Sequence, residues 1–460
     1  RQKEFIRKST NTAALRAFAE KQKKEFKANK AEALRLAKEK GWLISTVTDR
    51  GQRIELVGVQ DGQPVYYITH NSDAAQTINA DKVHEGGGAG LSLSGEGIIA
   101  AVWDGGAVRT SHQEFTGRVI QMDGATSVGD HPTHVAGTVG AAGEVEDAKG
   151  MAPAATIHTY DWSSDQNEVA LAAEDGLMLS NHSYGILAGW NWTSSGYQWN
   201  GNPSISTEED YKFGFYSGIS MQWDQLAFDA PYHLAMVSAG NDRGEGPGNG
   251  DYPDDGGETG FDCIAGKALS KNVMAVGSVN DLNDYSEPSD FVSSSFSSWG
   301  PTDDGRIKPD ICGNGYNVYS TLSSSDEAYG ASSGTSMSSP NVTGGMVLLH
   351  EHWLNLNDDP IKAATMKALV LHTAFEAGPH PGPDYMFGWG VMNTQAAAEV
   401  ISGNLVSSYI REESLAQGEN FSFDVYADGN QPLEVTIVWD EPAGSPGAPE
   451  LDPSEIRVVN

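Results

Sequence analysis

The sequence predicts an α/β fold, a parallel sheet with helices on both faces in three layers. Between about Gly97 and Gly403, short apolar runs alternate with helical segments, and glycines and polar loops bound each run. Uniformly apolar strands of this length are typical of a parallel sheet buried on both sides. The expected strands cover residues 98–102, 156–160, 177–180, 234–238 and 273–279, and a helix is expected to start near Thr335.

A small basic unit precedes this core. Residues 10–41 predict one helix, because Thr10 or Asn11 can cap its start and Gly41 can close its end. Three strands are expected next, over residues 42–48, 54–59 and 65–69. The last two are joined by an Asp-Gly turn, a strong hairpin signal.

Charge divides the chain in two. Residues 1–41 carry a net charge of +8, whereas the remainder carries −41. So acidic a body repels nucleic acid and anionic membranes, and neither is an expected partner. An acidic, lysine-poor surface suits a secreted protein in salt water or one that binds calcium, and it suits plain solubility equally well. No stretch has the roughly 18 uninterrupted apolar residues of a membrane span, and no secretory leader is visible.

Two features of the acidic body, its cysteines and its C-terminal stretch, leave alternatives open. Cys263 and Cys312 are too few for a disulfide framework, so they either form one bridge or stay as buried thiols. Residues 420–426 and 433–440 alternate like sandwich strands. Because two or three strands cannot bury a core of their own, they either pack on the main domain or begin a β-sandwich that continues past Asn460. We favour the second.

Three short motifs carry the chemistry. Asp104 ends an apolar run, His131 opens the segment His-Pro-Thr-His, and Ser336 lies at the start of the expected long helix. A serine hydroxyl becomes a nucleophile when an imidazole takes its proton and a carboxylate orients that imidazole. Taken singly, such residues are more often turn, core or capping residues. Asn241, beside Gly240 and after an apolar strand, adds a fourth candidate residue, a donor for an oxyanion. The four residues together, each within an extended motif, favour catalysis.

With these motifs, the chain from about Gly97 to Asn393 resembles the subtilisin-like serine peptidases, the subtilase family. The resemblance implies a subtilisin-like fold in which Ser336 is the nucleophile, His131 the general base and Asp104 the residue that orients it. It also implies that Asn241 lies in the oxyanion hole and that the second histidine, His134, is structural.

The resemblance further implies how a peptide would bind, as an added strand between two cleft strands. One cleft strand would contain Ser183, Tyr184 and Gly185, and the opposite edge would contain Trp162, Ser163 and Ser164. The chain departs from the family pattern at Gly105, where Ser or Thr is usual, and at Pro132, where Gly is usual. It departs again after Lys308-Pro309-Asp310, where Cys312-Gly313-Asn314-Gly315 replaces the usual Ala-Pro-Gly.

Two segments have uncertain roles. Residues 186–231 are longer than the family core requires and rich in aromatic residues. They form either an inserted lobe that buries its own rings or a wall beside the specificity pocket. Residues 1–71 are expected to be a pro-segment that inhibits the enzyme and whose positive charge favours docking on the acidic body, or else a permanent extension. The catalytic domain would then cover residues 72–403, and residues 404–460 would form the β-rich C-terminal segment.

No cofactor is expected for catalysis, although structural calcium is common in the family. The acidic stretches Asp251–Asp255 and Asp281–Asp284 are candidates, but neither has the spacing of an EF-hand loop and solvated turns are the commoner case. The sequence therefore predicts a secreted serine endopeptidase made as a zymogen and acting on proteins or peptides. An esterase or amidase using the same triad, and a catalytically silent binding protein on the same fold, remain alternatives.

Overall fold

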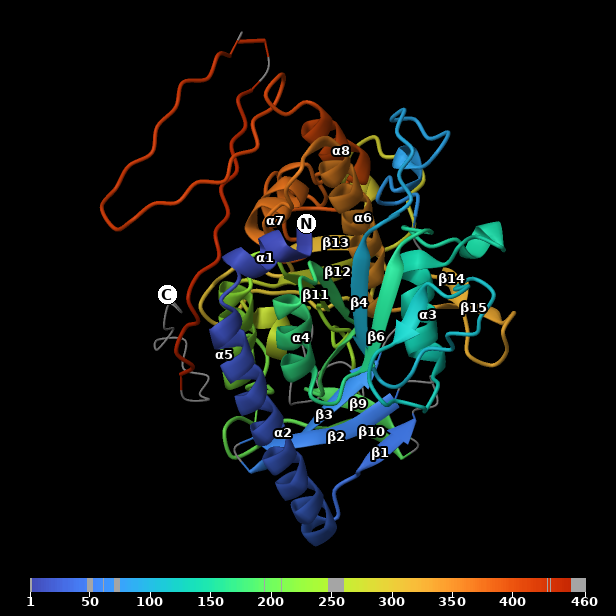
Figure 1. Cartoon of the computed structure of the whole chain (residues 1–460). Helices are drawn as coiled ribbons and strands as arrows, with labels where there is room; N and C mark the ends of the chain where they lie inside the picture. The colour runs from blue at the N-terminus through green and yellow to red at the C-terminus, as the bar shows by residue number, and fades with distance from the viewer. Residues whose placement is uncertain are drawn as a thin grey trace.

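The computed structural model describes residues 2–47, 53–60, 62–69, 75–193, 195–207, 209–246, 260–427, 429–430 and 432–447. Its centre is a seven-stranded sheet in the order β13-β12-β11-β7-β4-β6-β5, in which every neighbouring pair is parallel (Figure 1). The strands are β4 (Ile99–Asp104), β5 (Val119–Gln121), β6 (Thr156–Asp161), β7 (Leu179–His182), β11 (Leu234–Ser238), β12 (Met274–Val279) and β13 (Ile311–Asn314). The predicted fold class is confirmed.

Helices cover both faces of this sheet. Alternate residues of β4 show why, since Ala100 and Val102 belong to one buried cluster, and Ala101 and Trp103 to another. The first cluster includes residues of α3 (Asp130–Gly140), α6 (Thr335–Leu356), α7 (Ala363–His372) and α8 (Thr394–Ser402). The second includes residues of α4 (Asp165–Glu174) and α5 (Gly218–Asp229). None of the helices described is long and apolar enough to cross a membrane.

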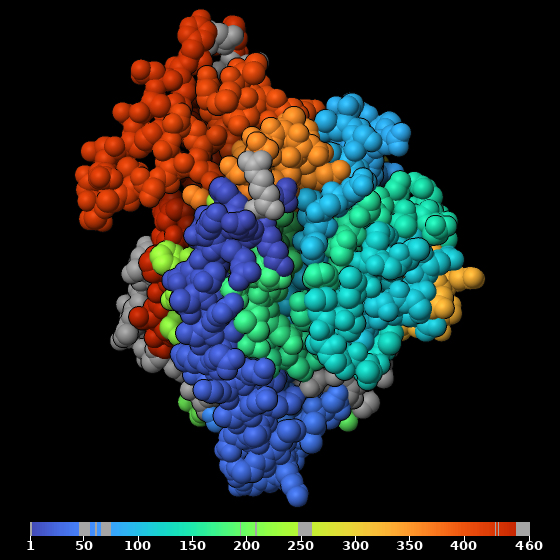
Figure 2. Space-filling model, viewed as in Figure 1, coloured from blue at the N-terminus to red at the C-terminus, as the bar shows by residue number. Residues whose placement is uncertain are grey.

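The N-terminal unit contains two helices, α1 (Gln2–Ser9) and α2 (Thr12–Lys40), where the sequence predicts only the second. Asn11 caps α2 by accepting the backbone N–H of Ala14, and Gly41 ends it in the left-handed region at φ 74°. The strands β1 (Ser45–Val47), β2 (Arg53–Gln60) and β3 (Gln63–Thr69) follow as an antiparallel meander. Figure 2 shows the N-terminal unit, in blue, lying directly against the main body.

The outermost strand of this meander joins the main body. Strand β3 pairs antiparallel with β8 (Tyr184–Ile186), which gives a four-stranded sheet in the order β1-β2-β3-β8. Two further two-stranded sheets complete the described structure. They pair β9 (Trp190–Thr193) with β10 (Gly196–Trp199), and β14 (Val318–Thr321) with β15 (Tyr329–Ser332).

The predicted C-terminal sandwich strands do not form. Within the described residues of 404–447, residues 420–426 and 433–440 are not strands. Figure 1 shows this part of the chain leaving the body in a wide loop, and on its return Thr436 Oγ1 lies 2.9 Å from Nδ1 of His372. Val435 and Ile437 are 76 % and 75 % exposed. The alternating pattern was the wrong guide here, because a strand forms only where a second strand takes up its backbone hydrogen bonds.

Candidate active site

Asp104 is the last residue of β4, at the carboxyl edge of the central sheet. Its carboxylate is fully buried, and Oδ1 accepts the Nδ1 proton of His131 at 2.6 Å and the backbone N–H of Gly105 at 2.6 Å. Oδ2 is buried without a hydrogen-bond partner.

His131 is the second residue of α3, and its side chain is 9 % exposed. Pro132 follows it in the first turn, where backbone N–H groups have no intrahelical acceptor, so proline removes no hydrogen bond. The departure from glycine at this position therefore leaves the imidazole seated on Asp104. His134 lies one turn further on, fully buried, with Nε2 3.0 Å from the carbonyl oxygen of Val318. Burial lowers the pKa of His134 to about 4, which suits a neutral structural residue.

Ser336 is the second residue of α6, and α6 packs against α3. Its hydroxyl donates to the carbonyl oxygen of Ser183 at 2.9 Å, and the Ser183 hydroxyl donates to the carbonyl oxygen of Ser336 at 2.7 Å. This reciprocal pair fixes the start of α6 against the strand that follows β7. At this place in the helix the N–H of Ser336 has no intrahelical acceptor and lies at the positive end of the helix dipole.

Asn241 follows β11, and its amide oxygen is fully engaged. It accepts the backbone N–H and the hydroxyl of Thr335, both at 2.9 Å. The amide NH₂ is therefore the end that can serve a substrate oxygen beside Ser336. Gly240 has φ 111° and no room for a side chain, because a Cβ there would lie 2.7 Å from Asp242 Oδ2. Burial raises the pKa of Asp242, which reduces the negative charge next to the amide.

The predicted cleft strand is β8, and it already holds a partner. Thr69, Ile68 and Tyr67 of β3 pair with Tyr184, Gly185 and Ile186, in antiparallel register. The N-terminal unit therefore occupies the strand edge where the resemblance places a peptide substrate.

The opposite cleft edge does not form a strand. Strand β6 ends at Asp161, and Ser164, at φ 68°, turns the chain into α4. Trp162 is fully buried, and a Cβ on Gly105 would lie 3.0 Å from its ring. The Trp162 ring thus fills the space beside Gly105, the residue that follows Asp104. Ser163 is exposed. A role of these residues in substrate binding stays a prediction.

A buried lysine beneath β8 carries no motif and was missed by the sequence analysis. Lys267 Nζ lies 3.1 Å from the centre of the Tyr184 ring and 3.5 Å from Asp165 Oδ2, and its side chain is 3 % exposed. The Tyr184 hydroxyl donates to the same carboxylate oxygen at 2.7 Å. Burial lowers the pKa of Lys267 to about 7. Lys267 and Asp165 thus fix the Tyr184 side chain, and with it β8. In the sequence, the available signal was a single lysine in an otherwise apolar run.

The remaining candidates concern cysteines and metal. Cys263 and Cys312 are both free, buried thiols. The acidic stretch Asp251–Asp255 lies outside the described residues. In the second stretch, Asp281 Oδ1 accepts the amide of Asn314. No group of three or more His, Cys, Asp or Glu side chains that could hold a metal ion gathers among the residues described. Structural calcium stays a prediction.

Comparison with known proteins shows the family of the chain. Residues 95–390 match the model of the subtilase family, and the chain belongs to that family.

Among curated relatives, the serine protease AprX of Bacillus subtilis is 28 % identical over 59 % of this chain and 61 % of its own length. The chain thus spans less than two thirds of that relative. Subtilisin DY of Bacillus licheniformis is 25 % identical over 70 % of this chain and 96 % of its own. Among solved structures, fervidolysin from Fervidobacterium pennivorans, a keratinolytic enzyme, is 23 % identical with a TM-score of 0.46, covering 70 % of this chain and 45 % of that one.

Proposed function

We propose that this protein is a secreted serine endopeptidase that hydrolyses peptide bonds through an acyl-enzyme. One observation carries the proposal. The buried carboxylate of Asp104 is bonded to Nδ1 of His131 at 2.6 Å, in a subtilase whose Ser336 and Asn241 lie at the starts of α6 and of the loop after β11. The esterase, amidase and silent-protein alternatives are outcomes of the tests below.

In this mechanism Asp104 keeps the proton of His131 on Nδ1, so that Nε2 is free to act as the base. As Ser336 Oγ adds to the substrate carbonyl carbon, its proton passes to Nε2. The resulting oxyanion is held by the Asn241 amide and the Ser336 N–H. The C–N bond then breaks, and the imidazolium protonates the leaving amine. Water, deprotonated by the same imidazole, hydrolyses the ester and restores Ser336.

We further propose that residues 1–70, one fewer than the 1–71 expected from the sequence, are the inhibitory pro-segment. The pairing of β3 with β8 supports this, as do the ion pairs that Arg16 of α2 and Arg7 of α1 form with Glu174 of α4. Strand β3 pairs as far as Thr69 with Tyr184, one residue from Ser183, whose carbonyl oxygen is 2.9 Å from Ser336 Oγ. His70 and Asn71 lie outside the described residues. We expect self-cleavage between them.

The test is intact mass of the purified chain beside its Ser336→Ala variant. We expect the wild type to lose residues 1–70 and the variant to keep them. If both keep the segment, casein hydrolysis by the wild type separates a permanent extension from an inactive site. A peptide and an ester substrate compared on the same sample separate a peptidase from an esterase. Serine labelling by a fluorophosphonate, in the wild type and not in the variant, contradicts the silent alternative.

A further inference from the structure

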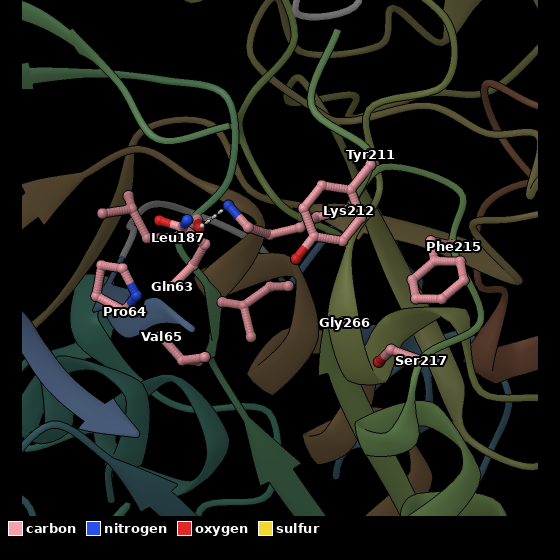
Figure 3. Close-up of a pocket in the computed structure, with 10 residues that line it drawn as sticks. Gln63, Pro64, Val65, Leu187, Tyr211, Lys212, Phe215, Ser217 and Gly266 are labelled. Atoms are coloured by element: carbon pink, nitrogen blue, oxygen red, sulfur yellow. Dashed lines mark hydrogen bonds between the residues drawn. The ribbon is translucent and has the colours of Figure 1, made fainter. Parts of the chain in front are cut away.

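A cavity lies beyond the far end of β8, between the N-terminal unit and the aromatic-rich segment of residues 186–231. Figure 3 shows its lining residues, with those of β3 on one side and Tyr211 and Phe215 on the other. Six residues give it an apolar character: Pro64, Val65, Ile186, Leu187, Tyr211 and Phe215. None of them belongs to the triad or the oxyanion hole.

The cavity lies on the path that the bound strand takes. Strand β3 pairs with β8 through residues 67–69, and Val65 lines the cavity two residues earlier. The last pair is Thr69 with Tyr184, and Tyr184 is one residue from Ser183, next to the nucleophile. The bond that we expect to be cut follows residue 70 of the sequence. Val65 is therefore the sixth residue before the bond that we expect to be cut. A peptide substrate that replaces β3 on β8 would run through the same cavity.

The wall facing β3 is held by the main body and not by β3. Lys212 Nζ donates to the carbonyl oxygen of Leu187 at 3.2 Å, to that of Asn200 at 2.8 Å and to Asp210 Oδ2 at 2.8 Å. The same buried carboxylate oxygen accepts the N–H of Gly189 at 2.9 Å. Lys212 and Asp210 thus form an ion pair. This network ties the chain after β8 to the aromatic segment, so the wall remains when β3 leaves.

The aromatic rings of the wall are also held in place. Tyr211 is 3 % exposed, and its ring lies 6.1 Å from that of Phe215. Other rings of the inserted segment do not line the cavity. Trp192 and Tyr197 pack on each other within the β9–β10 hairpin, with their ring centres 4.9 Å apart. Part of the insertion therefore buries its own rings, and another part faces the strand on β8.

We propose that this cavity is a distal substrate subsite, which takes an aliphatic side chain at the sixth residue before the scissile bond. The inference rests on the proposed peptidase function and adds to it a preference far from the reacting atoms. In the intact chain Val65 forms part of the cavity wall. In the processed enzyme the matching residue of a peptide substrate would take the place of Val65. Burial of a valine-sized side chain corresponds to about a tenfold to hundredfold difference in affinity.

The experiment uses the processed enzyme and three peptides of the chain's own sequence. The first covers residues 62–75, the second is the same peptide with Val65→Asp, and the third covers residues 67–75 and ends short of the cavity. We expect kcat/KM for the first peptide to exceed that for the second by about tenfold or more. In a Phe215→Ala enzyme, this ratio should fall at least threefold while the short peptide is cleaved as before.

The matched control is Trp192→Ala, which removes an aromatic ring of the same insertion that does not line the cavity. It should keep the wild-type ratio. An equal kcat/KM for the first two peptides, or a ratio that Phe215→Ala leaves unchanged, would overturn the subsite while the peptidase function stands. If neither the short peptide nor the chain itself is cleaved, the peptidase function fails, and the subsite fails with it.

Discussion

At the scale of single residues, the active site depends on hydrogen bonds that fix orientation. Asp104 uses Oδ1 for both of its partners, His131 and Gly105, and leaves Oδ2 unpaired. Asn241 uses its oxygen for Thr335 and so presents its NH₂. Gly105 thus orients the Asp104 carboxylate and Thr335 orients the Asn241 amide, both without a substrate.

Asn241→Ala removes the side-chain donor to the oxyanion. We expect kcat to fall about 100- to 1,000-fold with KM nearly unchanged, because the bond is made mainly in the transition state. Steady-state kinetics on a short peptide measure this. A change confined to KM would contradict the assigned role.

Asp104→Asn preserves the shape of the carboxylate but not its acceptor chemistry at both oxygens. The imidazole of His131 is then held in the wrong tautomer, and we expect kcat to fall by about 10⁴. The measurement is kcat, with near-wild-type thermal stability showing that the fold is intact. Self-cleavage at the normal rate would show that His131 does not depend on Asp104.

At the scale of elements, the N-terminal helix docks through charge. Arg16 forms a bidentate pair with Glu174 at 3.0 and 2.9 Å, and Arg7 reaches the same carboxylate at 3.2 Å. The Glu174 side chain is 9 % exposed, so these pairs are less screened than surface pairs. The split of charge between residues 1–41 and the remainder thus has a structural counterpart at the end of α4.

Arg16→Ala should loosen the N-terminal unit. After self-cleavage, we expect the cut segment to separate from the body at lower salt than in the wild type, with about tenfold weaker binding. Gel filtration over a salt series gives the retained fraction. The control is Arg35→Ala, since Arg35 pairs with Glu32 and Glu39 of its own helix. Equal behaviour of the two variants would show that Glu174 does not anchor the segment.

At the scale of the whole molecule, two acidic side chains, Asp262 and Asp303, lie close together in the interior. Asp303 Oδ1 and Asp262 Oδ1 lie 2.0 and 2.7 Å from the point that a Cβ on Gly214 would occupy, so the two carboxylates converge. Burial, with the neighbouring carboxylates, raises the pKa of Asp303 to about 8 and that of Asp262 to about 7. The folded protein therefore binds these protons more tightly than the unfolded chain.

A carboxyl group whose pKa is raised by folding stabilises the fold below its unfolded pKa, and this contribution is lost as pH rises through the folded pKa. We expect Tm to fall as the pH rises from about 4 to about 8, and Asp303→Asn to reduce that fall, because the amide does not ionise. Thermal unfolding in a Ser336→Ala background, where self-digestion is absent, measures the effect. An equal fall in Tm with and without Asp303→Asn would contradict it.

The sequence alone determined the sheet and the family, because both rest on local patterns. A buried parallel strand is apolar throughout, and the candidate side chain Asp104 follows at the end of one; its catalytic role, with those of His131, Ser336 and Asn241, stays a prediction. Asn11 and Gly41 bound their helix as predicted, since caps are local too. The alternating pattern of residues 420–426 failed, because the existence of a strand depends on a partner that the pattern does not supply.

Only the tertiary structure decided what lies against what. It paired β3 with β8, buried Lys267 beneath Tyr184 and turned Trp162 inward, and it left both cysteines as thiols. It also divided the aromatic insertion between a self-packed hairpin and a wall beside the bound strand. These contacts join residues far apart in the chain. Which of them form depends on the packing of whole elements, and no local signal in the sequence encodes that.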